Sequence, residues 1–200
     1  MQETKAKEDE KKEARASETD PEARVMKMAD GGFRPAFNVQ FATDVETQII
    51  VGVDVTNIGS DAGQMPPMVE QLHENFGLAP AEMLVDGGFA TTKAIDKVAE
   101  QPFGCTVFGP VQQPKDPMRD PHQPREGDSP TVASWRVRMG TDAAKTVYKL
   151  RAQTAECVNA IARNRGLYQF LVRGLWKVRA IALWFALAHN VNRSAALTRA

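Results

Sequence analysis

The 200-residue chain has 42% hydrophobic residues and equal numbers of acidic and basic side chains, 25 of each. This length and apolar content suffice for one globular domain with a core. Cys105 and Cys157 lie far apart and form no Cys-x-x-Cys pair, so neither a disulfide framework nor a zinc site is indicated. The longest apolar run, 180–188, has nine residues against about 20 for a membrane span, and the first residues are charged. We therefore expect a cytoplasmic protein without a membrane partner.

The charge is distributed unevenly along the chain. Residues 131–200 contain twelve Lys and Arg but only two acids, Asp142 and Glu156, a net charge of +10, whereas residues 1–130 contain 13 basic and 23 acidic side chains. A basic C-terminal part predicts a polyanionic partner. A solvated basic face is the alternative that charge alone leaves open.

The first residues form a charged segment. Residues 1–18 carry five basic and six acidic side chains and no Val, Ile, Leu or aromatic residue, which predicts a disordered tail or a solvated helix. Residues 19–22 (Thr-Asp-Pro-Glu) are typical of the start of a helix or a turn.

Strands and helices are expected to alternate between residues 33 and 108. Apolar alternation predicts a strand over 33–42, and a second, more apolar strand over 48–55 follows closely enough to form a hairpin. A three- and four-residue apolar spacing predicts a helix over 63–76. A strand over 83–85, a helix over 91–100 and a strand over 103–108 follow. This order predicts an α/β layered sheet.

The second half of the chain is expected to be a loop and then helices. Residues 109–130 hold six prolines and predict a long irregular loop. Helices are expected over 135–164 and 171–190. The last helix is apolar nearly all the way round, which favours a place in the core over an interface with a second subunit.

Glu156 is the one carboxylate in the stretch 148–170, which is otherwise rich in Lys and Arg. The composition predicts a helix there, with Gly166 as its stop. Glu156 is either one half of a surface ion pair or a metal ligand that faces a group of phosphate-binding basic side chains. Arg163 lies two turns further on, roughly 10 Å along the axis, so these two side chains cannot pair directly.

Outside the basic region, Asp86 is the acid whose position in the sequence points to a function. It follows a short apolar strand and precedes Gly87 and Gly88, a position where open α/β sheets bind ligands. An ordinary turn Asp before two glycines is the competing interpretation.

Several segments resemble, in order, the DDE transposases of bacterial insertion sequences. Residues 85–89 (Val-Asp-Gly-Gly-Phe) look like the motif around the second catalytic aspartate of that family. The set Tyr148, Arg151, Glu156, Arg163, Asn164, Arg165 and Gly166 resembles its Tyr-Arg-Glu-Lys signature. Residues 20–24, 37–40, 55–57 and 173–179 also look like segments of the family, so that the similarity covers roughly 19–193.

The resemblance implies a ribonuclease H-like fold, a mixed sheet flanked by helices, that in this chain lacks its first strand. Residues 19–193 would be a partial catalytic domain, preceded by the tail 1–18 and followed by a C-terminal tail, 194–200. The implied function is DNA transposition, through metal-dependent phosphodiester cleavage and strand transfer at transposon ends, in a bacterial, nucleoid-associated protein. A homo-oligomer or a full-length transposase is the implied protein partner.

The resemblance also assigns roles to individual residues. Asp86 and Glu156 would be catalytic ligands of a two-Mg²⁺ site, whose ions activate the attacking oxygen and stabilise the leaving one. The residues implied to bind DNA are Tyr148, Arg151, Arg163, Arg165 and Lys177. Arg163 stands where the family usually has Lys, and Cys157, Asn159 and Ala160 replace the usual Pro, Phe and Gly.

The first aspartate of the family has no counterpart in the chain. Nothing before residue 19 can form a buried strand, and neither Asp44 nor Asp54 matches the motif. We therefore expect the C-terminal part of a transposase that is inactive alone and works only when another chain supplies the missing strand and aspartate. A non-catalytic DNA-binding or subunit-association module that regulates a full-length enzyme is the main alternative, and another nuclease of the same fold is a third.

Overall fold

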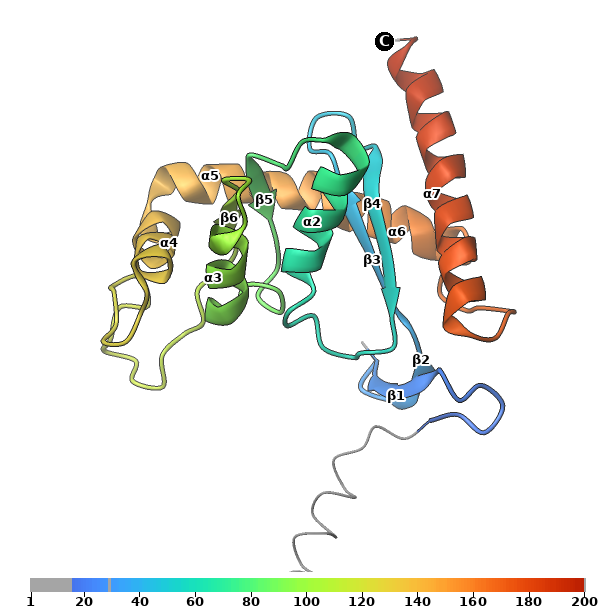
Figure 1. Cartoon of the computed structure of the whole chain (residues 1–200), viewed down its shortest axis with the longest axis horizontal. Coiled ribbons are helices and arrows are strands. Elements are labelled where there is room, and N and C mark those ends of the chain that lie inside the picture. The colour runs from blue at the N-terminus through green and yellow to red at the C-terminus, as the bar shows by residue number, and fades with distance from the viewer. Residues whose placement is uncertain (1–15, 29, 200) are drawn as a thin grey trace, which may run out of the picture.

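The computed structural model describes residues 16–28 and 30–199, so most of the predicted charged tail lies outside the described residues. Figure 1 shows short strands flanked by helices, which confirms a mixed α/β architecture. The strands are β1 (Arg24–Lys27), β2 (Phe33–Ala36), β3 (Asn38–Thr43), β4 (Ile50–Thr56), β5 (Glu82–Leu84) and β6 (Thr106–Phe108). The helices are α2 (Met65–Phe76), α3 (Thr92–Glu100), α4 (Pro130–Gly140), α5 (Asp142–Arg151), the π-helical turn η1 (Ala152–Glu156), α6 (Cys157–Asn164) and α7 (Leu175–Leu197).

The strands form three separate pairs, and this corrects the expectation of one continuous sheet. Pairs β1–β2 and β3–β4 are antiparallel, and β5–β6 is parallel. Among the described residues, no strand joins the β3–β4 pair to the β5–β6 pair (Figure 1).

The expected strand over 33–42 is divided into β2 and β3 at Phe37, and β2 pairs with β1, which the sequence analysis did not predict. The β3–β4 hairpin was predicted correctly, with Val39 opposite Val55 and Phe41 opposite Val53. Asp44 closes its turn by accepting a 2.8 Å hydrogen bond from the Thr47 amide. The hydrogen bond from the Thr47 hydroxyl is the largest cause that lowers the pKa of Asp44 below its ordinary value.

Prolines, glycines and a capping side chain mark the points where several helices begin or end. Pro66 and Pro67 lie in the first turn of α2, and Gly77, at a φ of 69°, ends it. The expected helix over 135–164 begins earlier, at Pro130, and is interrupted after Gly140, where the Thr141 hydroxyl accepts from the Ala144 amide and caps α5. Gly166 follows α6 at a φ of 93°, which confirms the predicted stop.

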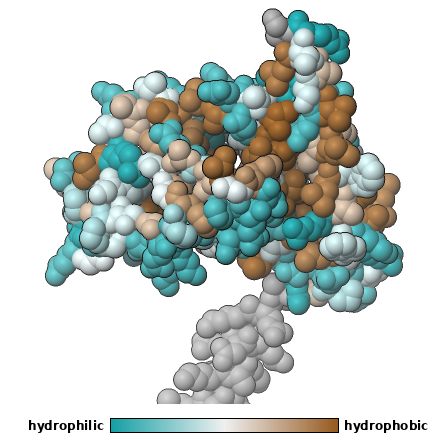
Figure 2. All heavy atoms as spheres, turned by 45° about the horizontal axis from the view of Figure 1, so that its top comes forward, coloured by the Kyte–Doolittle hydropathy of each residue, from teal (hydrophilic) through white to brown (hydrophobic). Residues whose placement is uncertain are grey.

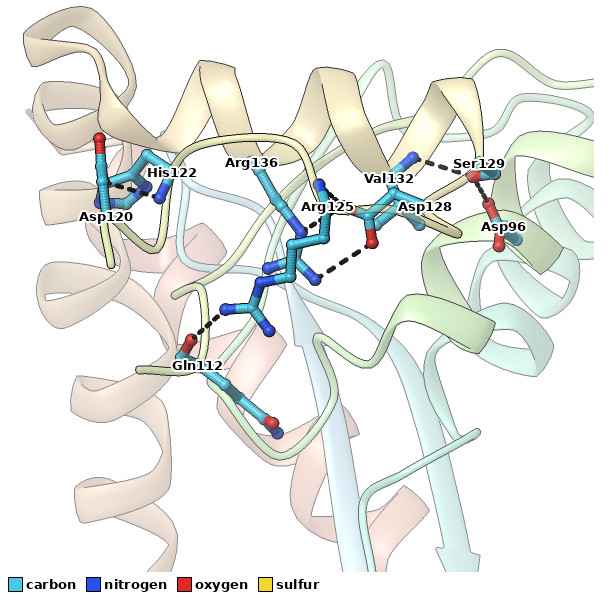
Figure 3. Close-up of polar contacts among 9 residues, drawn as sticks. All are labelled: Asp96, Gln112, Asp120, His122, Arg125, Asp128, Ser129, Val132 and Arg136. Atoms are coloured by element: carbon cyan, nitrogen blue, oxygen red, sulfur yellow. Dashed lines mark hydrogen bonds and ion pairs between the residues drawn. The ribbon is translucent and has the colours of Figure 1, made fainter. Parts of the chain in front are cut away.

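The loop between β6 and α4 contains no helix or strand, as predicted, but side chains anchor it to the fold (Figure 3). Arg136 Nε donates to Asp128 Oδ2 over 2.7 Å, and both side chains are more than nine-tenths buried. Burial raises the pKa of Asp128, but the hydrogen bonds from Arg136 and from the Arg125 amide, with the charge of Arg136, outweigh it and hold the pKa below its ordinary value. Ser129 caps α4 and also bonds to Asp96 on α3, so the end of the loop is tied to two helices.

Two hydrophobic cores lie side by side and share one helical rod. The first gathers apolar side chains of α2, α3, α4, α5 and the β5–β6 pair around the buried Trp135. The second packs the β3–β4 pair against Val158 of α6 and Val178 of α7. Figure 1 shows α5 and α6 running behind both strand pairs as one nearly continuous rod, with η1 at the junction.

Helix α7 differs from the expectation of a mostly buried core helix. Four of its side chains are buried, namely Val178, Ala182, Ala186 and His189. Its large apolar side chains Trp176, Leu183, Trp184, Leu187 and Val191 are exposed. The helix also continues to Leu197 and so includes part of the expected tail 194–200. None of the helices in the described part of the chain is both long and apolar enough to cross a membrane.

Two amide side chains cap the β4 outer edge, by which we mean the side of β4 away from β3. Asn190 of α7 accepts from the Ile50 amide and donates to the Ile50 carbonyl, both over 2.8 Å. Gln71 of α2 makes the same pair of bonds to Val53, both at 3.2 Å. This edge is therefore closed to pairing with a further strand.

Replacing Asn190 with Leu should lower the free energy of unfolding by about 1–3 kcal/mol, because the N–H and C=O of the buried Ile50 lose their partners. Urea unfolding followed by tryptophan fluorescence measures the change. Asn192→Leu is the matched control, since the exposed Asn192 amide bonds within α7 itself, to Ala188. Equal losses in the two variants would contradict a capping role for Asn190.

Candidate active site

Asp86 lies just beyond the carboxyl end of the β5–β6 pair. The Val85 amide donates to the Phe108 carbonyl, which extends the pairing to the residue before Asp86. Asp86 Oδ1 accepts from the Gly88 amide over 3.0 Å and shapes the turn. Asp86 is therefore a turn aspartate through its Oδ1. Its Oδ2 points toward Arg151 instead of the turn, and its side chain is 42% exposed.

Arg151 joins the two carboxylates that the sequence singled out. Its Nη1 donates to Glu156 Oε1 over 2.8 Å, and its Nη2 lies 3.5 Å from Asp86 Oδ2. Asp86 and Glu156 are 70 positions apart in the chain, yet one guanidinium contacts both. The side chain of Arg151 is 22% exposed and that of Glu156 58%, so the cluster is accessible from solvent.

The π-helical turn η1 aligns Glu156 with Arg151. In an α-helix, residues five positions apart point in directions about 140° apart around the axis. A π-turn has hydrogen bonds between residues i and i+5, so residues five apart come to the same side. Thr154, inside η1, is buried and its hydroxyl donates to the Leu150 carbonyl at 3.0 Å. Such turns are rare and occur frequently at functional sites.

Tyr148 lies beside the same cluster, one turn before Arg151. Its half-buried ring also packs against the first core. Burial is the largest cause that raises the pKa of the Tyr148 hydroxyl above its ordinary value, and the charges of Asp86 and Glu156 raise it further. Arg151 lowers the same pKa through its charge and a hydrogen bond. The structure thus brings together four of the predicted site residues.

The other three predicted DNA-binding residues lie outside this cluster. Arg163 is near the end of α6, Arg165 follows it, and Lys177 is in the first turn of α7. All three side chains are exposed, and within the described ranges no hydrogen bond or ion pair joins them to Asp86 or Glu156. They lie on the surface, apart from the two acids.

Asp61 is a third carboxylate near Asp86, which sequence reasoning missed. A Cβ added at Gly88 would lie 3.2 Å from Asp61 Oδ2 and 3.2 Å from Asp86 Oδ1, so both oxygens lie against this glycine. Asp61 Oδ1 accepts from Asn38 Nδ2 over 2.7 Å, which orients the carboxylate. Its position in a loop after β4 was visible in the sequence, but its approach to residues 86–88 depends on tertiary structure.

Asp44 and Asp54 lie away from the cluster. Asp44 is in the hairpin turn, and Asp54 of β4 has Arg179 Nη1 at 4.0 Å from its Oδ1. Neither has a contact with Asp86 or Glu156 among the described residues.

The donors at the cluster suit a divalent cation in type. Carboxylate oxygens are the ligands that Mg²⁺ prefers, and the cation now between Asp86 and Glu156 is the Arg151 guanidinium. Within the described ranges, no three His, Cys, Asp or Glu side chains converge closely enough to hold a metal ion. The arrangement therefore consists of two carboxylates that are held by one guanidinium, which lies between them.

Replacing Arg151 with Gln should raise the pKa of Tyr148 further, because the substitution removes the positive charge that lowers this pKa and leaves both acids in place. The ultraviolet absorbance of phenolate against pH measures it in a Tyr168→Phe background, where Tyr148 is the one remaining tyrosine. Lys149→Gln, which removes a neighbouring exposed charge, is the control. An unchanged or lower Tyr148 pKa in the Arg151 variant would show that the guanidinium does not act at this cluster.

A comparison with protein families finds a match in the second half of the chain. Residues 122–195 match the family model of the transposase DDE domain. No curated protein and no solved structure matches the chain. The matched segment contains Glu156, Arg151 and the three exposed basic residues, while Asp86 and Asp61 lie outside it. Residues 122–195 are therefore similar to the DDE domain of transposases.

Proposed function

We propose that this chain supplies the second and third acidic residues, Asp86 and Glu156, of a transposase site that cleaves and joins DNA at transposon ends in a metal-dependent reaction. The observation that carries the proposal is the bridge through Arg151. It joins Glu156, inside the segment related to transposases, to Asp86, which lies outside that segment and was selected from the sequence independently.

The free edge of β3 supports the proposal that a further strand completes the domain. Because Val53 bonds outward to Gln71, its partner Phe41 must also direct its backbone groups away from the hairpin. No hydrogen bond from another described element reaches the backbone of Val39 or Phe41. On the same strand, the buried atoms Gln40 Nε2 and Thr43 Oγ1 have no partner in the described structure. The β3 edge is thus open, whereas the β4 outer edge is capped.

The added strand would belong to a ribonuclease H-like sheet between β3 and β5 and would carry the first aspartate. It would come from another chain. When bound, divalent metal ions would polarise the scissile phosphate and activate the attacking oxygen. Arg151, once released from the carboxylates, and Tyr148 beside it would hold a DNA phosphate at the site. Arg163, Arg165 and Lys177 would bind the flanking backbone.

Glu156→Gln should abolish cleavage and joining of DNA that carries the element's terminal repeats, because a carboxylate ligand is lost. The assay compares the chain alone with the chain plus a first-strand fragment of a full-length transposase, in Mg²⁺ or Mn²⁺. Glu126→Gln, which changes an exposed loop acid, is the matched control. We expect activity with the fragment, none without it, and none when the aspartate of the fragment is replaced by Asn.

The other outcomes discriminate between functions. If the chain alone cleaves DNA and Glu156 is needed, another of its acids completes the site, and Asp61→Asn tests the nearest one. If the chain binds DNA but cleaves nothing with any fragment, the catalytic proposal fails and a regulatory DNA-binding module remains.

Replacing Arg163, Arg165 or Lys177 with Gln should each weaken DNA binding severalfold and reduce the slope of affinity against salt by about one, because one phosphate contact is lost. Fluorescence anisotropy over a salt series measures both quantities. Lys93→Gln on α3, an exposed cation in the acidic part of the chain, is the control. An unchanged salt slope in all three variants would exclude these residues from the DNA interface.

A further inference from the structure

Helix α7 presents an apolar stripe that no described element covers. Trp176 is 80% exposed and Trp184 68%, and Leu183, Leu187 and Val191 are exposed with them. Positions 176, 180, 183 and 187 recur at spacings of four and three residues, which is typical of the seam between packed helices. Figure 2 shows the hydrophobic surface following this helix up to its C-terminal end. Exposed apolar surface of this extent marks an interaction site.

A groove of about 600 Å³ lies beside the stripe, between α2 and α7. Its α2 wall carries Glu70, Gln71 and Glu74, and its α7 wall carries Arg179, Leu183 and Leu187. The groove follows the β4 outer edge, where Gln71 and Asn190 already bond to the backbone of Val53 and Ile50. An added strand would find the backbone groups of Ile50 and Val53 already bonded. The occupant must instead contact the groove through its side chains, as a helix does.

The charges of the two walls identify the helix that fits. Helix α2 contains Glu70 and Glu74 and no Lys or Arg. Helix α7 contains Lys177, Arg179 and Arg193 and no Asp or Glu. A helix with an apolar seam and basic flanks complements a groove with an apolar side and an acidic wall. The chain itself carries such a helix, namely α7.

We propose that this chain forms a twofold-symmetric dimer in which the α7 helix of each copy lies in the α2–α7 groove of the other copy. The two apolar stripes pack against each other at the centre, and Arg179, beside the stripe of each α7, faces the acidic α2 wall of the other copy. The contact is isologous, so it closes on itself and leaves no second groove unfilled. It uses none of the cluster residues Asp86, Arg151 and Glu156.

Sedimentation equilibrium of the full chain tests the proposal. The unchanged chain should be a dimer, and the Leu183→Gln/Trp184→Gln variant should dissociate more easily by about tenfold or more, since two central apolar contacts are lost. Leu171→Gln is the control, because Leu171 is also an exposed leucine but lies outside α7. Thermal unfolding checks that each variant folds. A monomeric unchanged chain would overturn the proposal, as would a dimer that the double variant leaves intact.

A charge exchange tests the pairing of the walls. In Glu70→Lys/Glu74→Lys both walls become basic, and in Arg179→Glu both become acidic, so each variant alone should be monomeric. Mixed in equal amounts, the two variants should form a heterodimer, because each α7 then faces an α2 wall of opposite charge. Failure of the mixture to associate, with both variants folded and the unchanged chain dimeric, would contradict this arrangement.

Discussion

The ion bridge from Arg151 to Asp86 and Glu156 is the interaction on which the candidate site depends. It joins a turn that follows the β5–β6 pair to the helical rod behind both cores, so the positions of the two acids are coupled. The partners are partly exposed, so the bridge contributes little to stability by itself. Its importance is geometric, because it keeps two like charges near each other, and like charges at short range repel unless a cation lies between them. In the structure that cation is an arginine, and in the proposed function a metal ion replaces it.

The π-turn η1 makes this bridge possible. Helix α5 belongs to the first core and α6 to the second, so the turn between them lies where the two cores meet and contacts β3. A side chain at this junction reaches both strand pairs. This explains why Arg151 can contact an acid from the β5–β6 half while Glu156 remains on the rod. The Tyr148 ring packs at the edge of the first core, and its hydroxyl interacts with the Arg151 guanidinium.

The two edges of the β3–β4 hairpin differ in whether their backbone groups have hydrogen-bond partners. The β4 outer edge is closed by the amides of Gln71 and Asn190, and the groove along it suits a helix. The β3 edge has backbone groups without partners from other described elements, and it suits a strand. The two proposed assemblies, strand addition at β3 and helix exchange at α7, therefore use opposite sides of the same hairpin and do not compete. Both follow from where backbone hydrogen bonds are satisfied and where they are not.

Local patterns in the sequence determined much of this protein. Alternation and three- to four-residue spacing predicted the β3–β4 hairpin, α2 and α3, short apolar runs predicted β5 and β6, and the proline-rich stretch predicted the loop, because these features arise between near neighbours. Glu156 was selected because it is the single glutamate among basic residues. Asp86 was selected because it is the aspartate before Gly87. Tertiary structure alone decided the rest. Three strand pairs replaced one sheet because pairing depends on partners distant in sequence, and the approach of Asp61 to Asp86 depends on how two loops meet. Helix α7 was expected in the core from its composition, but a helix that is apolar all round does not reveal which face its neighbours cover, and the β3–β4 pair covers one side only.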